Sequence, residues 1–401
     1  MSARHTTLKK QQVEDALHYI EEYWKTTKRK SVGGDSTLIG LPHPYIVPGP
    51  ESKHFVFNEQ YYWDSYFIAL GIDDEELVTG MLDNLIYLFE NFGLIPNANR
   101  YYFTSRSQPP ILTTYIFHVY EKYQKDDNWL RKKIAIAKKE YETVWMSKDH
   151  PHARRVFEGL SRYYDINFLH DLAEAESGWD MTPRFERQCL DFIPFDLTCL
   201  LYKYESDFLK TAELFGDEDE AARWQAAMNS RRKAANTYHW HNRHKYFFDY
   251  NFQKGEHGKV WSVAGYYALW SGLATSAQAS ELVDKLHRFE KKGGLTTTIG
   301  NFMFYNLFGS TKTQWAYPNG WAPLHYFAIE GLENYNFAGA AQRIAKRWLH
   351  TNLNWFEEHG VFLEKYNVIN TELKPAEGLY PSQTGFGWTN GVFVYLCDQY
   401  L

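Results

Sequence analysis

The chain has 401 residues and a formal net charge of -6, which argues against a nucleic-acid surface, where clustered lysine and arginine must neutralise phosphates. Aromatic residues make up 18%, a content that suits either a sugar site, in which planar side chains stack on pyranose rings, or simply a large core. The cysteines Cys189, Cys199 and Cys397 are odd in number and lack metal-ligand spacing, so we expect no disulfide framework.

The N-terminal residues run into charged helical sequence without the apolar segment of a signal peptide. No uninterrupted apolar run of about 18 residues follows, so we expect a soluble cytoplasmic protein with no membrane partner. Residues 8–30 predict an amphipathic helix, because Val13, Ala16 and Ile20 recur at three- and four-residue steps between charged positions. We expect residues 1–32 to pack on the outside of the domain.

Helical periodicity resumes along the rest of the chain, and strand signals are few. The predicted helices lie at about 75–91, 110–124, 128–146, 193–215, 219–238, 260–273, 277–291, 320–332, 335–357 and 386–400. With segments near residues 8 and 60 they make about twelve helices, and no low-complexity linker divides them. We therefore expect one all-α domain over residues 1–401, with helix pairs in an inner and an outer ring around a funnel lined by loops.

Two early segments are dense in polar residues. Residues 55–66 mix acids and aromatics too closely for a plain helix face or a buried strand. Residues 95–110 form a loop of hydrogen-bond donors that suit sugar hydroxyl groups, although a polar surface loop with a helix cap would look the same. Its donors are Asn97, Asn99, Arg100, Arg106 and Gln108.

The segment 174–184 carries two glutamates, then Gly178, Trp179 and Asp180. Gly178 lets the backbone approach a ligand and Trp179 offers an apolar wall, so the carboxyl group of Asp180 would lie in a confined cleft with a raised pKa. Such an acid can protonate a leaving group. A helix-ending turn with a solvated acidic patch is the alternative.

Two later segments complete the set of candidates. Trp315, Tyr317 and Trp321 surround a proline and a glycine, and they predict either a stacking wall or a hydrophobic lid over the core. Glu364 lies between apolar residues on a short strand-like run. It is either paired with lysine for structural reasons or the second acid that glycoside hydrolysis requires opposite Asp180.

The histidines of segment 239–244 have no partner cluster, and they precede residues 245–250, which predict an exposed turn and hairpin. We therefore predict no metal site there. The chain also has no GxGxxG after a strand and no P-loop, so we expect no cofactor.

Seven of these stretches, in the same order, resemble the trehalase family over roughly residues 45–400. They are Pro48-Gly-Pro with Phe57-Asn-Glu-Gln-Tyr-Tyr-Trp-Asp-Ser-Tyr66, Pro96-Asn-Ala-Asn-Arg, Ser105-Arg-Ser-Gln-Pro-Pro110, Glu176-Ser-Gly-Trp-Asp180, Gln314-Trp-Ala-Tyr-Pro-Asn-Gly-Trp-Ala-Pro323, Glu364-Lys-Tyr366 and Gly385-Phe-Gly-Trp-Thr-Asn-Gly391. The resemblance implies an (α/α)6 barrel and an inverting hydrolase of α,α-trehalose, with Asp180 as general acid and Glu364 as general base. The substrate-binding residues that we expect are Phe57, Tyr61, Trp63, Asp64, Asn97, Arg106, Ser107, Gln108, Gly178, Trp315 and Trp321.

The sequence also departs from the family pattern. Val56 and Ala316 replace an arginine and an aspartate of the two signatures, and the Arg-Pro-Glu segment that holds the second glucose is absent. The family has a glycine-rich lid that contains a glutamate, and residues 374–379, before Tyr380, take the place of this lid here. The alternatives are therefore a hydrolase of glucosylglycerate, mannosylglycerate or another α-glucoside, or an inactive sugar-binding protein. The candidates to replace the lost charges are Arg155, Arg162, Glu174 and Arg184.

Overall fold

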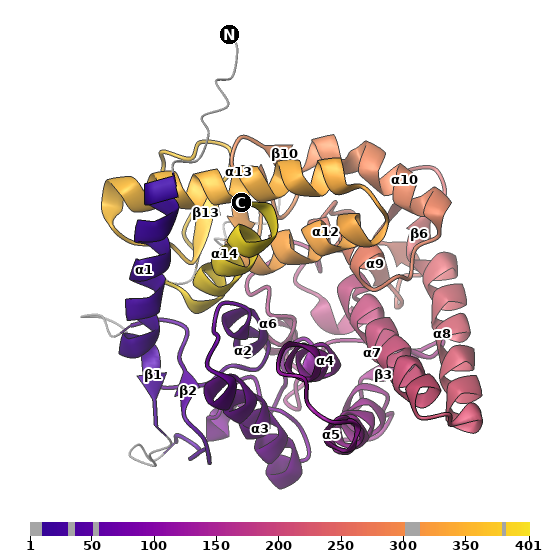
Figure 1. The fold of residues 1–401 in the computed structure, drawn as a ribbon. Coiled ribbons are helices and arrows are strands. Elements are labelled where there is room, and N and C mark those ends of the chain that lie inside the picture. Colours follow the sequence, from indigo (N-terminus) through magenta and orange to yellow (C-terminus); the bar gives the residue numbers. More distant parts are fainter. Residues whose placement is uncertain (1–9, 31–36, 51–55, 301–312, 379–381) are drawn as a thin grey trace.

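The computed structural model describes residues 10–30, 37–50, 56–300, 313–378 and 382–401 (Figure 1). Its α-helices are α1 (Lys10–Thr27), α2 (Tyr62–Ala69), α3 (Glu75–Phe92), α4 (Leu112–Lys122), α5 (Asp127–Glu140), α6 (His170–Glu176), α7 (Phe195–Leu214), α8 (Glu218–Tyr238), α9 (Tyr267–Trp270), α10 (Ser276–Lys285), α12 (Ala322–Asn334), α13 (Ala338–His359) and α14 (Gly387–Tyr400).

The strands are short and pair antiparallel in small sheets. They are β1 (Lys28–Arg29), β2 (Tyr45–Ile46), β3 (Arg155–Phe157), β4 (Leu160–Ser161), β5 (Phe192–Ile193), β6 (Trp240–His241), β7 (Tyr246–Phe247), β8 (Tyr250–Asn251), β9 (Glu256–His257), β10 (Glu290–Lys291), β11 (Gly294–Leu295), β12 (Asn319–Trp321) and β13 (Lys365–Asn367).

The helices form two concentric rings (Figure 1). The inner ring runs through α2, α4, α7, α9, α12 and α14, and α14 packs back on α2 to close it. Outer helices cover this ring: α3 lies on α2, α5 on α4, α8 on α7 and α13 on α12. Helix α1 contacts α13 and α14, so the first and last helices of the chain are neighbours. This arrangement is the predicted (α/α)6 barrel.

The inner helix α2 is buried on every side. All eight residues of α2 are buried, and a run of apolar residues without helical period is what such a helix needs. The closest approach is between α14 and α2, where a Cβ atom at Gly391 would overlap the carbonyl oxygen of Phe67. Only glycine allows the two backbones to meet in this way.

The outer helices are amphipathic, and side chains cap several of their ends. Asp74, Asp126 and Asp217 accept hydrogen bonds from the backbone N–H groups of α3, α5 and α8, respectively. Thr275 and Gln278 form a capping box at the start of α10. These caps satisfy N–H groups that have no partner inside the helix.

Most of the predicted helices are present, with three differences. Residues 260–273 contain only the four-residue α9 after a 3-10 turn, and the predicted helix 277–291 ends at Lys285 and gives way to β10. Helix α6, whose last turn overlaps the start of segment 174–184, was not predicted. Of the N-terminal helix predicted at 8–30, residues 8 and 9 lie outside the described residues, as does Phe55 of segment 55–66.

The hairpin predicted at residues 245–250 exists, because β7 pairs with β6, but the exposure predicted for it is wrong beyond Lys245. Residues 246–249 are buried, as is His239. The ring nitrogens of His239 lie 2.8 Å from the carbonyl oxygen of Phe248 and 3.2 Å from Oγ1 of Thr198. In the described part of the chain, no helix is both long and apolar enough to cross a membrane.

Candidate active site

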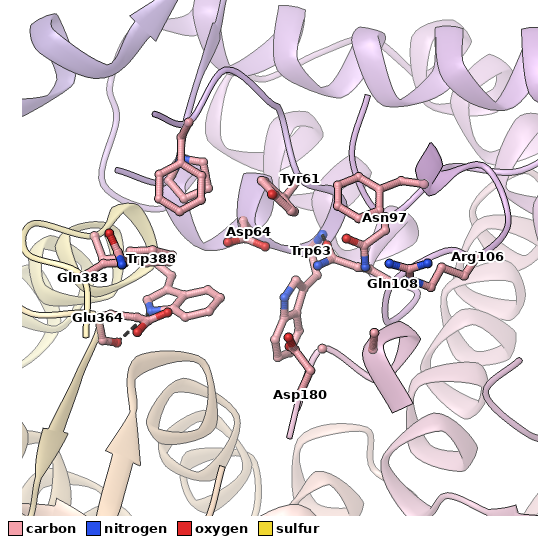
Figure 2. Close-up of a pocket in the computed structure, with 16 residues that line it drawn as sticks. Tyr61, Trp63, Asp64, Asn97, Arg106, Gln108, Asp180, Glu364, Gln383 and Trp388 are labelled. Carbon is pink, nitrogen blue, oxygen red and sulfur yellow. Dashed lines mark hydrogen bonds between the residues drawn. The ribbon is translucent and has the colours of Figure 1, made fainter. Parts of the chain in front are cut away.

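A cavity of about 760 Å³, open to solvent, lies where loops from distant parts of the chain meet (Figure 2). The side chains come from the loops before α2, α4, β13 and α14, from the first turns of α2 and α14, and from the end of α6 and the segment after it. The lining residues are Pro48, Phe57, Tyr61, Trp63, Asp64, Asn97, Phe103, Arg106, Gln108, Ala175, Gly178, Asp180, Glu364, Gln383, Phe386 and Trp388.

Ten of the thirteen residues predicted for the site therefore line one cavity, although they span the chain from Phe57 to Glu364. Ser107, Trp315 and Trp321 do not line it. The hydroxyl group of Ser107 donates a hydrogen bond of 2.6 Å to the carbonyl oxygen of Ile95, inside the protein.

Asp180 is held by a backbone approach that only glycine permits. Gly178 has a φ of +71°, and a Cβ atom there would lie 2.8 Å from Cε2 and Cζ2 of Trp63. The ring of Trp63 therefore packs directly on the backbone two residues before Asp180. Burial, with a further contribution from the charge of Glu364, raises the pKa of Asp180 to about 7.

The acidic patch before Asp180 is not solvated. Glu174 and Glu176 are both buried, and Glu176 accepts hydrogen bonds from the backbone N–H groups of Ser107 (2.6 Å) and Tyr164 (2.7 Å). It also forms a buried ion pair with Arg154. Glu176 therefore joins the acid segment to the polar loop at 95–110, and the alternative of a solvated turn is wrong.

Glu364 reaches the cavity from the other side, beside Gln383 and Trp388 (Figure 2). It directly precedes β13, which pairs with β12, and its carboxyl Oε2 lies 2.7 Å from Nζ of Lys365. Its carbonyl oxygen accepts a hydrogen bond of 3.0 Å from the indole Nε1 of Trp388. Glu364 is therefore paired with a lysine, as the structural alternative predicted. It also faces the cavity, as a catalytic role requires.

Asp64 adds a third carboxyl group between the other two (Figure 2). It lies in the first turn of α2. Burial raises its pKa to about 8, and the charges of Asp180 and Glu364 contribute. Asp64 is therefore protonated at neutral pH, and a protonated carboxyl group can donate a hydrogen bond.

The polar loop divides into residues that face the cavity and residues that support it. Asn97, Arg106 and Gln108 line the cavity. An oxygen of Gln108 accepts a hydrogen bond of 3.1 Å from the backbone N–H of Trp63. Arg106 lies 3.4 Å from Asp165, and its buried Nε has no hydrogen-bond partner within the described residues. An unpartnered buried donor beside a cavity is available to a ligand.

The other two donors of this loop are structural. Asn99 accepts a hydrogen bond from the backbone N–H of Gln60 and donates one to the carbonyl oxygen of Ile39. Arg100 pairs with Glu59 at 2.5 Å. They hold the loop in place from behind.

The tryptophans predicted to form a stacking wall lie behind the cavity instead. They cover the core, which was the alternative prediction. Trp315 and Trp321 are buried and stack at 3.7 Å with an interplanar angle of 2°. Trp315 in turn contacts Trp63 and Trp388, with ring centroids 6.1 Å and 6.0 Å apart. The stacked pair therefore supports two tryptophans that do line the cavity.

Six lining residues were not predicted as site residues: Pro48, Phe103, Ala175, Gln383, Phe386 and Trp388. Phe386 and Trp388 belong to the motif Gly385–Gly391, and this motif could have identified them as site residues. No motif indicated a site role for Gln383 or Ala175.

The candidates for the lost leaving-group charges do not line the cavity. Arg184 is fully buried and binds Asp196 and Asp249, each at 2.7 Å. Arg162 donates to the carbonyl oxygen of Leu190, and Glu174 accepts from the N–H of Thr182. Arg155 belongs to β3 and does not border the cavity either. In the segment that replaces the lid, Leu379 and Tyr380 lie outside the described residues.

Metal ligands are not grouped in the described ranges: no three or more His, Cys, Asp or Glu side chains are placed to hold a metal ion there.

Comparison with known proteins identifies relatives over nearly all of the chain. The family model described as Trehalase matches residues 2–167 and 161–400. A probable trehalase from Eremothecium gossypii is 33% identical over 439 residues, covering 91% of this chain and 58% of that protein, so the chain spans less than two thirds of this relative.

Among solved structures, a neutral trehalase from Saccharomyces cerevisiae superposes with a TM-score of 0.76 at 32% identity, over 88% of this chain and 73% of that one. A mannosylglycerate hydrolase from Thermus thermophilus in complex with glucose is 19% identical, with a TM-score of 0.68 over 95% of this chain and 99% of that one, and this likeness shows the fold. The family match over most of the sequence, on a barrel whose cavity gathers the residues of its motifs, makes this chain a member of the trehalase family.

Proposed function

We propose that the protein is an inverting glycoside hydrolase that cleaves α,α-trehalose into two glucose molecules. The observation that carries the proposal is the contrast between two carboxyl groups on one cavity. Asp180 is half-buried and its pKa is raised to about 7, whereas Glu364 lies 2.7 Å from the ammonium group of Lys365. One carboxyl group that retains its proton as an acid and a second that acts as a base are the two groups that hydrolysis with inversion needs.

In the proposed reaction Asp180 donates its proton to the glycosidic oxygen as the bond from that oxygen to C1 breaks. Glu364 takes a proton from a water molecule whose oxygen forms the new bond to C1 on the opposite face of the ring. Attack from that face turns the α configuration at C1 into β. The products are one β-glucose and one glucose released as the leaving group, and proton exchange with solvent restores both carboxyl groups.

The remaining lining residues support the binding of a glucose unit. Trp63 and Trp388 give flat apolar surfaces, and Asn97, Arg106 and Gln108 give amide and guanidinium donors. Asp64, protonated at neutral pH, adds a hydroxyl donor next to the reacting carboxyls. We infer that these groups hold the glucose whose bond is cleaved.

Replacement of Asp180 tests the catalytic assignment. Asp180→Asn keeps the size of the side chain but cannot donate the proton, so we expect kcat to fall by about 10²–10⁴-fold with little change in thermal stability. Proton NMR of the first product should show β-glucose before mutarotation. Near-normal turnover by the variant would refute the role of Asp180, and α-glucose as the first product would refute inversion.

The leaving-group side of the cavity determines which glucoside is cleaved. None of the four candidate charges lines the cavity, which favours testing leaving groups other than glucose. We rank trehalose first because the family motifs are present, and a glucosylated glycerate or another α-glucoside second. Purified protein should be incubated with trehalose, kojibiose, nigerose, glucosylglycerate and mannosylglycerate. Preferential hydrolysis of another member would replace trehalose, and binding without glucose release would indicate a sugar-binding protein. The cytoplasmic location stays a prediction.

A further inference from the structure

Lys365 is a buried cation next to the proposed base. Its side chain has no solvent exposure, and its Nζ lies 2.7 Å from Oε2 of Glu364. The ammonium group also lies 5.0 Å from the ring centre of Trp321. An ammonium group loses much hydration energy on burial, so its position here depends on these partners.

Gln314 connects this lysine to the segment of the proposed acid. Its side chain is fully buried, and its Oε1 accepts a hydrogen bond of 3.2 Å from Nζ of Lys365. Its Nε2 donates a hydrogen bond of 2.8 Å to the carbonyl oxygen of Asp180. One continuous chain of hydrogen bonds therefore runs from the carboxyl group of Glu364 through Lys365 and Gln314 to the backbone of Asp180.

The surroundings leave this chain little freedom to move. Trp321 pairs with Lys365 in the β12–β13 register, and it stacks on Trp315. Asn319 donates a hydrogen bond of 2.9 Å to the carbonyl oxygen of Gln314. A Cβ atom at Gly378 would lie 2.8 Å from Cβ of Gln314, so the backbone of residue 378 presses on that side chain.

We propose that Lys365 and Gln314 are positioning residues for the hydrolysis: Lys365 holds the carboxyl group of Glu364 and aims it at the attacking water, and Gln314 fixes Lys365 relative to the loop that presents Asp180. This inference rests on the proposed function. Neither residue touches the sugar, since neither lines the cavity. Their effect on the reaction is therefore through the base and through the distance between base and acid.

The division of the effect between kcat and KM separates this role from a purely structural one. Lys365→Met removes the partner that holds the carboxyl group of Glu364 at 2.7 Å. We therefore expect kcat to fall by about 10²-fold, the usual range for general-base assistance, with KM changed less than threefold.

A substrate with a good leaving group distinguishes the base side from the acid side. Fluoride needs no protonation to leave, so α-glucosyl fluoride should restore much of the activity of Asp180→Asn. It should restore little in Lys365→Met, because the attacking water still needs its base. Gln314→Leu keeps the ammonium group of Lys365 beside Glu364, so we expect a smaller fall in kcat, of about tenfold.

Lys292→Met is the matched control, because Lys292 is an exposed lysine, 3.6 Å from Glu372, away from the cavity. It should match the wild type in kcat and KM. Wild-type kcat in Lys365→Met, or its full recovery with α-glucosyl fluoride, would overturn the inference. If Lys365→Met does not fold, wild-type kcat in Gln314→Leu would overturn it instead. A wild-type protein that releases glucose from neither trehalose nor α-glucosyl fluoride would refute the proposed function itself.

Discussion

Gly178→Ala tests whether the contact of Trp63 with the backbone positions the acid. The new methyl group would lie 2.8 Å from two carbon atoms of the Trp63 ring, and the residue would keep a φ of +71°. The left-handed conformation costs a non-glycine residue about 1–2 kcal/mol. Overpacking in a rigid core costs about 1–3 kcal/mol more. We therefore expect the free energy of unfolding to fall by about 2–5 kcal/mol.

Gly93→Ala provides the matched control. Gly93 has a φ of +73°, and a Cβ atom there has no atom within 4 Å, so this variant bears only the conformational cost of about 1–2 kcal/mol. Urea unfolding followed by tryptophan fluorescence measures both variants, and initial rates of glucose release measure kcat/KM. We expect Gly178→Ala to lose at least about tenfold in kcat/KM, or 1.4 kcal/mol of transition-state stabilisation, and Gly93→Ala to lose none. Equal loss of stability in the two variants would refute the reasoning.

Three further predictions follow from the charges of the fold. Because Asp180 must be protonated and its pKa is raised to about 7, kcat/KM should decline above about pH 7, and a profile flat to pH 9 would contradict this. Arg184→Met leaves two buried carboxylates without their partner, so we expect the free energy of unfolding, measured in urea, to fall by about 3–5 kcal/mol. Arg223→Met breaks an exposed ion pair and should lower it by less than about 1 kcal/mol. Burial lowers the pKa of His239 from 6.5 to about 4. Unfolding therefore takes up a proton as the pH falls below 6.5, and the free energy of unfolding decreases by on the order of 1 kcal/mol per pH unit. The same decrease with pH in His239→Gln would show that His239 is not its cause.

The outer helices were predictable because they show one apolar face. Leu77, Met81, Leu85 and Leu88 mark α3, and the predicted range 75–91 differs from the observed helix by one residue. The inner helices α4, α7, α12 and α14 were also predicted, each within two residues of its observed ends. Helix α2 was expected only as a segment near residue 60, because a helix buried on all sides has no periodicity to detect. Residues 260–273 were misjudged for a related reason: apolar content indicated burial but not that Gly265 lies against the ring of Tyr246, where the chain forms a 3-10 turn.

Motifs predicted which segments meet, but not which way each side chain points. The carboxyls and amides of the cavity were found because few other roles suit them together. Trp315 and Trp321 differ from Trp388 only in facing the core, and an aromatic residue serves either place equally well. Arg184 was a reasonable candidate for a ligand, yet it binds Asp196 and also Asp249, which is 65 residues away and beyond what local sequence indicates.

The closure of the inner ring by α14 on α2 has a consequence for biosynthesis. A nascent chain that has not reached residue 387 lacks the surface on which Phe67 and Ile68 are buried, and it also lacks Trp388 of the cavity. The ribosome makes this helix after more than three hundred residues have emerged, at about 5–20 residues per second. The apolar inner face of α2 therefore remains without its final partner for most of translation. Chains terminated before α14 should depend on chaperones and should have no assembled cavity.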